Sequence, residues 1–411
     1  MMRLKVVVIG HSFTSRLGII RSVAQIGCSI TVIVLTGYKR FSKTLKDAKQ
    51  IDCYSKYVDE TYYCYGSDEK GLIQLLLNKC ADAHQKVIII PDSDFSAAVI
   101  DRNQDKLKNS FLFPHINHHA GAVAVWMNKE KQKSLAKVIG LHVADGTVVE
   151  ITQGRYELPQ TIKYPCFTKP LLTIAGGKKL LHRCDQESTL RKILDKAARL
   201  SPSIGVLIED YKVIEEEYAV LGFTDGKKTI IPAVIKFLQS SQSHPGIALR
   251  GEIMPTKGFE DVINQFKIYV QQIGFCGLFD IDFYLSEGKL YFGELNLRFG
   301  GSGYAVTKLG GNLPGMMVKT LCGERIDEMK REVKQSATFV NERMCLDDWY
   351  RGYLSENELH QLIETADIRF IDDGDDRMPQ YAFEQALRKK SIRRPLVKYY
   401  IRMKNIISNI R

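Results

Sequence analysis

The chain has 411 residues, of which 45% are hydrophobic and 26% charged, values typical of a folded protein of two or three domains with a sizeable core. The net charge is +11, but residues 388–411 hold nine Lys or Arg and no acid, so the excess belongs mainly to the C-terminal tail. Because no basic and aromatic pattern extends into the body, we expect no nucleic-acid partner.

Neither secretion nor membrane insertion is indicated. The first ten residues hold too short an apolar run for a signal peptide, and no run of 18 apolar residues occurs. The nine cysteines are odd in number and form no C-x-x-C pair, so we expect neither a disulfide framework nor a zinc site. These features favour a cytoplasmic location.

The first 120 residues alternate between apolar runs and amphipathic helical patterns. Strands are expected at 5–10, 29–35 and 87–90, and helices at 15–26 and 68–83. This alternation predicts an α/β domain with a doubly wound parallel sheet.

Polar loops follow the first and third of these strands. Gly10-His11-Ser12 does not match the dinucleotide pattern G-x-G-x-x-G, so no dinucleotide site is inferred. Four polar residues nevertheless fall near the carboxyl ends of strands, where parallel sheets bind ligands: Ser12, Thr14, Asp92 and Asp94. Ordinary helix caps and turns are the alternative interpretation.

Two segments link this domain to the next. The histidine-rich run at 115–119 has no acidic or cysteine partner at metal-ligand spacing, so a polar loop is the better interpretation. A helix is predicted from Asn128 to Ile139, ended by Gly140 as a C-cap.

Residues 161–183 join a strand that carries Lys169 to a glycine pair. The lysine would supply a point charge for phosphate, and Gly176, Gly177 and Lys178 would form a lid whose backbone can approach and move. An ordinary surface hairpin shows the same residue types, so this pattern alone does not identify a site.

The next strands are expected at 206–211, 219–222 and 230–237. Three glutamates, 215–217, lie between the first two, where a charged turn is the alternative to a functional role. Beyond the third strand is a polar loop at 240–246, and Lys236 or Arg250 could meet a carboxylate or an acyl phosphate there. A helix at 259–273 follows.

Residues 277–303 carry the densest chemistry. Period-two alternation predicts strands at 279–285 and 290–299 joined by a hairpin. With an odd number of loop residues, Asp280 and Asp282 would share a face with Glu294, Asn296 and Arg298.

Like charges placed across a sheet repel, so such a cluster indicates a bound cation. Two carboxylates and an amide, Asp282, Glu294 and Asn296, suit a hard ion such as Mg²⁺, with Mn²⁺ as a substitute. The solvated face of an edge hairpin is the simpler alternative. Arg298 and the glycine run at 300–303 argue against it, because they could meet an anion.

Asp282 followed by Glu294-x-Asn296-x-Arg298 resembles the metal-binding signature of the ATP-grasp superfamily, with Leu297 where proline is usual. Pro165 to Pro170 also matches the family's x-P-x-x-x-K-P element. The resemblance is strongest to the carbamoyl-phosphate-synthase-like group, which includes D-aspartate ligases. It implies an N-terminal α/β domain followed by a two-part ATP-grasp domain.

The resemblance also implies roles. Lys129, with Lys131 as its competitor, and Lys169 would contact ATP phosphates beneath the lid. The segment at Glu209 and Tyr211 would read the adenine edge through its backbone. Glu217 would hold the ribose, with the register open among the three adjacent glutamates. Arg298, joined by Arg250, would serve catalysis.

The activity implied is ATP-dependent ligation of a carboxylate to an amine through an acyl phosphate, adding an amino acid to a cell-envelope or polysaccharide precursor. The partners would be these small molecules, and the oligomeric state stays undetermined. A small-molecule kinase and a nucleotide-binding scaffold without turnover are the alternatives.

The implied domains are 1–120, 121–205 with the lid, 206–325 with the metal site, an extension at 326–387, and the tail at 388–411. The extension shows no chemical constellation, and its acidic run at 372–376 is interpreted as a solvated turn. The tail could form a basic amphipathic helix on anionic lipid, at the inner face of the membrane, or dock on the protein's own acidic surface.

Overall fold

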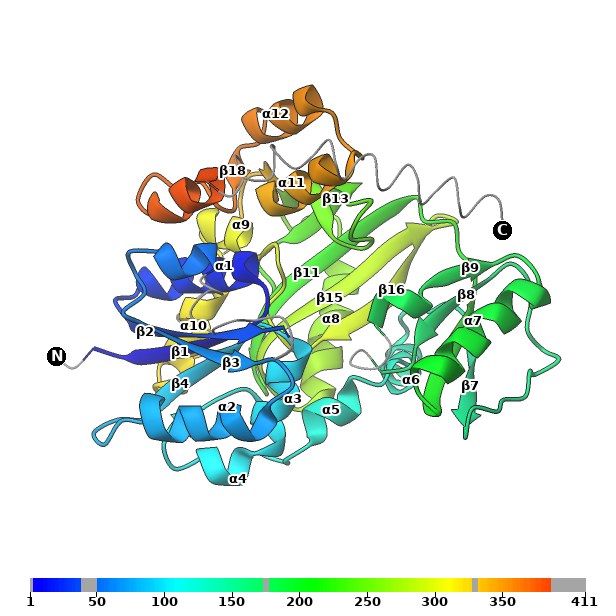
Figure 1. The fold of residues 1–411 in the computed structure, drawn as a ribbon, viewed down its shortest axis with the longest axis horizontal. Coiled ribbons are helices and arrows are strands. Elements are labelled where there is room, and N and C mark those ends of the chain that lie inside the picture. Colours follow the sequence, from blue (N-terminus) through cyan, green and yellow to red (C-terminus); the bar gives the residue numbers. More distant parts are fainter. Residues whose placement is uncertain (1–2, 38–49, 173–176, 327–331, 386–411) are drawn as a thin grey trace.

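In the computed structural model, a large sheet lies between an N-terminal α/β sheet and a small central sheet, with the last helices packed above it (Figure 1). The structure describes residues 3–37, 50–172, 177–326 and 332–385. Gly176 and the basic tail at 388–411 therefore lie outside the described residues. The structure does not test the proposed contacts of the tail. No helix within the described ranges is long and apolar enough to cross a membrane.

The N-terminal sheet is parallel and doubly wound, as predicted. Its strands run in the order β3 (Glu60–Tyr65), β2 (Ser29–Thr36), β1 (Lys5–Gly10), β4 (Val87–Pro91) and β5 (Phe111–Leu112). The central strands are buried on both faces because helices cover both sides. The covering helices are α1 (Phe13–Ala24), α2 (Glu69–Leu75) and α3 (Asp94–Arg102).

The central part begins with α6 (Lys129–Ile139), which the left-handed Gly140 ends as predicted. A four-stranded antiparallel sheet follows, covered by α7 (Glu187–Leu200), whose apolar face packs on it. Its strands, in spatial order, are β7 (Gly146–Thr152), β10 (Ser203–Asp210), β8 (Cys166–Pro170) and β9 (His182–Cys184).

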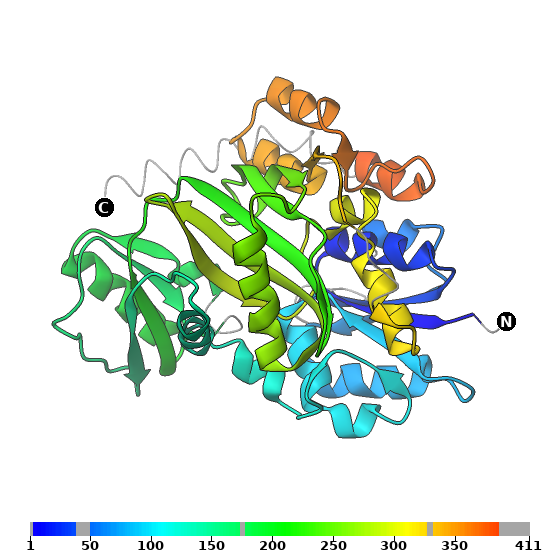
Figure 2. The same cartoon turned by 180° about the vertical axis from the view of Figure 1, so that it is seen from behind.

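The large sheet has nine strands. Its main path is β16 (Lys289–Asn296), β15 (Phe275–Ser286), β11 (Glu216–Asp225), β13 (Val234–Ser240), β14 (Ala248–Met254), β17 (Ala337–Val340) and β18 (Ile368–Arg369), with β12 (Thr229–Ile230) and β6 (His115–Ile116) at its side. Seen from behind, α8 (Glu260–Ile273) lies across one face of this sheet (Figure 2). On the other face, α9 (Gly303–Lys308) and α10 (Leu313–Leu321) pack against α1, so one continuous core joins the large sheet to the N-terminal domain.

The hairpin between β15 and β16 achieves its register differently from our expectation. Its turn has two residues, Glu287 and Gly288, both with positive φ, and Ser286 pairs with Lys289. An even loop alone would place Asp282 and Glu294 on opposite faces. A β-bulge at Gly293 restores the shared face, because the register shifts by one residue between the Phe283 and Asp282 pairs.

The extension beyond residue 325 is part of the large sheet, because β17 pairs with β14. Two further helices, α11 (Glu342–Arg351) and α12 (Glu356–Glu364), form their own small core with Leu249. The acidic run at 372–376 is not simply a solvated turn as we expected. Asp373 contacts Tyr304 and Lys308, and buried Asp376 pairs with Arg21 of α1.

The ion pair between Arg21 and Asp376 gives a stability prediction. The two side chains are 2% and 1% exposed, and the carboxylate also accepts a hydrogen bond from the Lys56 amide. Removing one member of a buried pair leaves an uncompensated charge. We expect Asp376→Ala to lower the free energy of unfolding by about 3 kcal/mol in urea denaturation. The matched control is Asp375→Ala, which changes an exposed residue next to Asp376. Its free energy of unfolding should stay close to that of the wild type.

Candidate active site

A cavity of about 310 Å³ opens where three parts of the chain meet: the carboxyl edge of the N-terminal sheet, one face of the large sheet, and the start of the C-terminal extension. The four polar residues predicted at strand ends, Ser12, Thr14, Asp92 and Asp94, all line it. The large sheet contributes Asp280, Asp282, Asn296 and Arg298, and the extension contributes Asn341 and Met344.

The predicted acid cluster forms on β15 and β16. Asp282 pairs directly with Glu294, and Asp280 with Asn296, whose amide donates to Asp282 Oδ2 at 3.4 Å. Burial raises the pKa of Asp280 to about 6, although Arg298 opposes the shift. Burial also raises the pKa of Asp282, reinforced by Asp280 and Glu294. The positive charge near these two carboxylates is therefore too small to offset the effect of burial on their pKa values.

Arg298 connects the two halves of the cavity. Its guanidinium lies 3.2 Å from Asp280 and 3.4 Å from Asp94, at the start of α3. Burial alone would lower its pKa, but the surrounding carboxylates outweigh this and raise the pKa. Arg298 is thus held as a fixed cation between the N-terminal domain and the acid cluster.

Of the two predicted phosphate lysines, one lies beside the acid cluster and the other beside Glu209. Lys129 Nζ is 2.5 Å from Glu294, and Lys169 is 2.7 Å from Glu209. A third lysine that we did not predict, Lys133, shares Glu209 at 2.5 Å. Its position one helical turn after Lys129 was the available sequence signal, because residues four apart share a helix face.

The structure also places the proposed adenine segment. Glu209 accepts from two lysines, while the backbone amide of Tyr211 donates to Pro165 at 3.1 Å. The guanidinium of Arg183 lies 4.5 Å from the centre of the Tyr211 ring. Gly177 and Lys178 lie at the start of a short 3-10 helix, Gly177–Leu180.

The three adjacent glutamates have different surroundings. Glu215 accepts from the amide of Glu287 in the hairpin turn, and Glu216 pairs with Lys236 at 2.5 Å. Glu217 lies two residues from Ala219, which lines the cavity opposite Asp282, so alternation puts it on the cavity face. Of the three, Glu217 is the one whose position suits a ligand.

Arg250 is not brought to the cavity with Arg298, and this corrects our expectation of a shared catalytic role. The pairing of β13 with β14 is irregular here, and Arg250 lies opposite Gln239. Both residues line a separate cavity of about 240 Å³ beside α12. Lys236, the other candidate, is paired with Glu216.

The extension contributes to the site, although its sequence shows no constellation. Asp348 of α11 is fully buried and accepts hydrogen bonds from Ser241 Oγ and from the amides of Gln242 and Ser243. These bonds hold the polar loop at 240–246, which reaches the cavity at Gly246. Asp348 is therefore a positioning residue for this loop.

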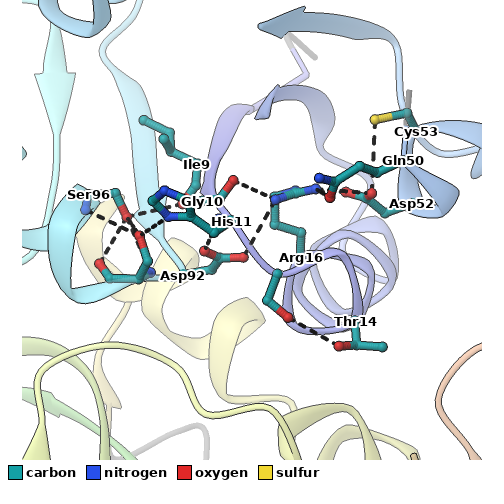
Figure 3. A network of polar contacts seen from close by, with 12 residues as sticks. Ile9, Gly10, His11, Thr14, Arg16, Gln50, Asp52, Cys53, Asp92 and Ser96 are labelled. Atoms are coloured by element: carbon teal, nitrogen blue, oxygen red, sulfur yellow. Dashed lines mark hydrogen bonds and ion pairs between the residues drawn. The ribbon is translucent and has the colours of Figure 1, made fainter. Parts of the chain in front are cut away.

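The N-terminal loops are held by a buried polar network (Figure 3). Arg16 donates to Asp52 at 2.7 and 3.1 Å and to the carbonyl oxygen of Gly10 at 2.5 Å. Asp92 Oδ1 accepts from the amide of His11 at 3.1 Å. A Cβ at position 10 would lie 1.2 Å from that oxygen, so only glycine fits beside Asp92.

Within the described ranges, no group of three or more His, Cys, Asp or Glu side chains is arranged to hold a metal ion. The predicted set has two carboxylates and one amide. Glu294 is held by Lys129, and Asp282 has no described cation within ion-pair distance, so these oxygens are suited to a further cation.

Comparisons with known proteins find sequence relatives for about half of the chain. No protein-family model matches the chain. The carbamoyl phosphate synthase large chain of Gemmatimonas aurantiaca is 23% identical over 208 residues, which is 49% of this chain and 19% of that protein. The C-terminal section of the same protein from Methanocaldococcus jannaschii is 21% identical, over 50% of this chain and 34% of that one. The chain thus matches only a minor part of these relatives' length.

Solved structures share the fold across 82% of this chain. The biotin carboxylase domain of the Hydrogenobacter thermophilus 2-oxoglutarate carboxylase, in complex with MgADP, gives a TM-score of 0.61 at 16% identity over 74% of its length. An L-amino acid ligase from Bacillus licheniformis gives 0.60 at 14% over 80%. N5-carboxyaminoimidazole synthetase from Staphylococcus aureus, with ADP, gives 0.59 at 17% over 82%.

The chain therefore has the ATP-grasp fold, as the resemblance of the β15–β16 hairpin sequence predicted. Within that superfamily, its sequence relatives and structural neighbours lie in the group that contains carbamoyl phosphate synthase, biotin carboxylase and amino-acid ligases.

Asp92 supplies a pH-dependent prediction. Burial raises its pKa to about 7, against the opposing effect of Arg16. A carboxyl group with a higher pKa in the folded chain takes up a proton on folding, so its contribution to stability falls as pH rises from about 4 to about 7. Asp92→Asn removes this titration. We expect the difference in the free energy of unfolding, variant minus wild type, to rise by about 2 to 3 kcal/mol between about pH 5 and pH 8 in urea denaturation.

The exposed Asp375→Asn variant is the control for this experiment and should follow the wild type at both pH values. A constant difference between Asp92→Asn and the wild type would show that Asp92 titrates normally.

Proposed function

We propose that the chain is an ATP-dependent carboxylate–amine ligase. The observation that carries this proposal is the grouping of five side chains. Asp282, Asn296 and Arg298 line the cavity, Glu294 lies directly opposite Asp282 on the next strand, and Lys129 is paired with Glu294. Phosphoryl transfer needs this combination of hard-metal ligands and fixed cations, because its transition state spreads charge over phosphate oxygens.

Mg²⁺, or Mn²⁺, would be held by Asp282, Glu294 and Asn296 and would neutralise phosphate charge when bound. The solved neighbours with MgADP or ADP support this nucleotide and metal. Lys129, now paired with Glu294, would turn to phosphate once that carboxylate has a metal partner. The pair of Lys169 with Glu209 would open in the same way.

The other residues would orient the nucleotide. Glu217, on the cavity face, would accept hydrogen bonds from the ribose hydroxyls. The backbone around Glu209 and Tyr211 would meet the adenine edge. The glycine lid at 176–178 would cover the phosphates and exclude water.

The proposed reaction has two steps. A carboxylate oxygen of one substrate attacks the γ-phosphorus of ATP, and the bond to ADP breaks to give an acyl phosphate. The amine nitrogen then attacks the acyl carbon, phosphate leaves, and the nitrogen loses a proton as the amide forms. Arg298 would stabilise the charge on the phosphoryl oxygens and on the tetrahedral centre.

We further propose an amino acid as one substrate and a cell-envelope or polysaccharide precursor as the other. The amino-acid ligase among the structural neighbours supports the first part. The basic composition of 388–411 supports a precursor presented at an anionic membrane surface.

Glu294→Gln tests the metal-binding hairpin. Removing one carboxylate should lower the Mg-dependent rate of ADP release by about 10²- to 10³-fold, because charge stabilisation at the transferring phosphate is lost. ADP release would be followed by a coupled assay. Glu287→Gln, in the exposed hairpin turn, is the matched control and should keep the wild-type rate. Unchanged turnover in Glu294→Gln would contradict the metal assignment.

The reaction class is tested by measuring ADP and phosphate with Mg-ATP and a panel of D- and L-amino acids pooled with carboxylate acceptors. Ligation predicts ADP, phosphate and an amide in equal amounts, dependent on one amino acid. A phosphorylated product without an amide would instead identify a kinase, and nucleotide binding without release would identify a scaffold.

Deleting residues 388–411 tests the membrane proposal. We expect the shortened chain to keep its turnover of soluble substrates and to lose binding to vesicles of anionic phospholipid, measured by co-sedimentation. Vesicles of neutral phospholipid are the control. Equal binding of both forms to anionic vesicles would contradict the proposal.

A further inference from the structure

The loops after β1 and β4 form the end of the cavity that belongs to the N-terminal domain. The functions proposed above for the hairpin, lysines and lid leave this end without a role. It is lined by Ser12, Ser15, Asp92 and Ser93, and Arg298 separates it from the acid cluster through its contact with Asp94. Its chemistry can therefore be considered separately from metal and nucleotide.

Two buried polar atoms at this end lack hydrogen bonds. Asp92 Oδ2 and Ser15 Oγ have no hydrogen-bond partner among the described residues, although each side chain belongs to a residue only 5% exposed. Buried polar groups are almost always paired, and leaving one unpaired costs about 1–3 kcal/mol. Both residues line the cavity, so a ligand there that supplies hydrogen-bond donors would satisfy these atoms.

The nearest protein cation does not satisfy Asp92. Arg16 lies 4.0 Å from Asp92 Oδ2, too far for a hydrogen bond, because its own donors bind Asp52, Gly10 and Gln50 (Figure 3). The other cavity arginine, Arg298, is held by Asp94 and Asp280.

The charges along the cavity favour a cation. Among the described residues that line it, four aspartates face a single arginine. An anionic group would be repelled by the carboxylate of Asp92, although the positive end of the α1 helix dipole is close. A second divalent ion is disfavoured because one carboxylate beside Arg16 gives too few ligands and too much positive charge. A primary ammonium group suits the site, because it carries a positive charge together with three N–H donors.

We propose that Asp92 and Ser15 form a subsite for a primary ammonium group carried by the ligase's amine substrate, with Asp92 Oδ2 and Ser15 Oγ accepting its N–H bonds. This inference rests on the proposed function and adds a substrate class to it. It gives the N-terminal domain the task of selecting the amine, while the large sheet and the central domain handle the nucleotide.

The test measures binding of amines to the full chain without ATP, so it does not depend on turnover. The probes are free L- and D-amino acids, ethanolamine and 1,4-diaminobutane, each compared with its N-acetylated counterpart, by isothermal titration calorimetry. We expect at least one amine to bind and its acetylated form to bind at least about tenfold more weakly, because acetylation removes the charge.

The variants locate the binding. Asp92→Asn should weaken binding of that amine by about tenfold or more, and Ser15→Ala by about threefold or more, since a hydrogen bond to a charged group is lost in each. Ser15→Ala removes a hydroxyl that makes no hydrogen bond in the protein, so it should fold normally. Asp105→Asn, exposed in the same domain, is the matched control and should bind as the wild type.

The assignment is wrong if no amine probe binds, if acetylated probes bind equally well, or if both cavity variants bind as the wild type does. Failure of the ligase proposal gives a different result. The chain would then bind an amine through Asp92 but would release no ADP from Mg-ATP when that amine and the pooled carboxylates are present.

Discussion

The repulsion between Asp282 and Glu294, which lie directly opposite each other on β15 and β16, is the constraint around which the site is built. Two carboxylates in this position are unfavourable unless cations balance them. Lys129 reaches Glu294 from α6, and Arg298 reaches Asp280 from the strand end. Lys129 and Arg298, which would contact a nucleotide, therefore also hold the acids in place before a nucleotide or a metal binds.

The same cations connect separate parts of the chain. Lys129 ties the helix that opens the central part to the large sheet, and Arg298 ties the large sheet to Asp94 of the N-terminal domain. Such pairs add little net stability once desolvation is counted, but they fix geometry, because breaking one leaves a buried charge. A ligand that supplies alternative partners could therefore loosen these connections between the parts of the chain.

The sequence predicted the fold class and most of the acid cluster, because these depend on short-range patterns. Strand–helix alternation is sufficient to predict a parallel sheet, and period-two alternation is sufficient to predict the hairpin that carries the acids. It could not predict how the hairpin reaches its register. Whether an extra residue lies in the turn or at a bulge depends on backbone pairing. The isolated Gly293 favours a bulge, but a glycine within a strand does not by itself fix the register. Nor could the sequence show that Arg250 lies beside an irregular stretch of the β13–β14 pairing and lines a separate cavity.

The sequence by itself determined which reactive side chains the chain carries and on which local elements they lie: acids and an amide on one hairpin, a lysine near a glycine pair, and aspartates at strand ends. Tertiary structure alone decided which of these groups meet. It joined Asp92 and Ser15 to the cavity, placed Glu217 on the same face of the large sheet as Asp282, and brought Asp348 of the extension to the loop at 240–246. Local patterns fix the face on which a side chain lies, whereas contacts between residues distant in the chain depend on how whole elements pack.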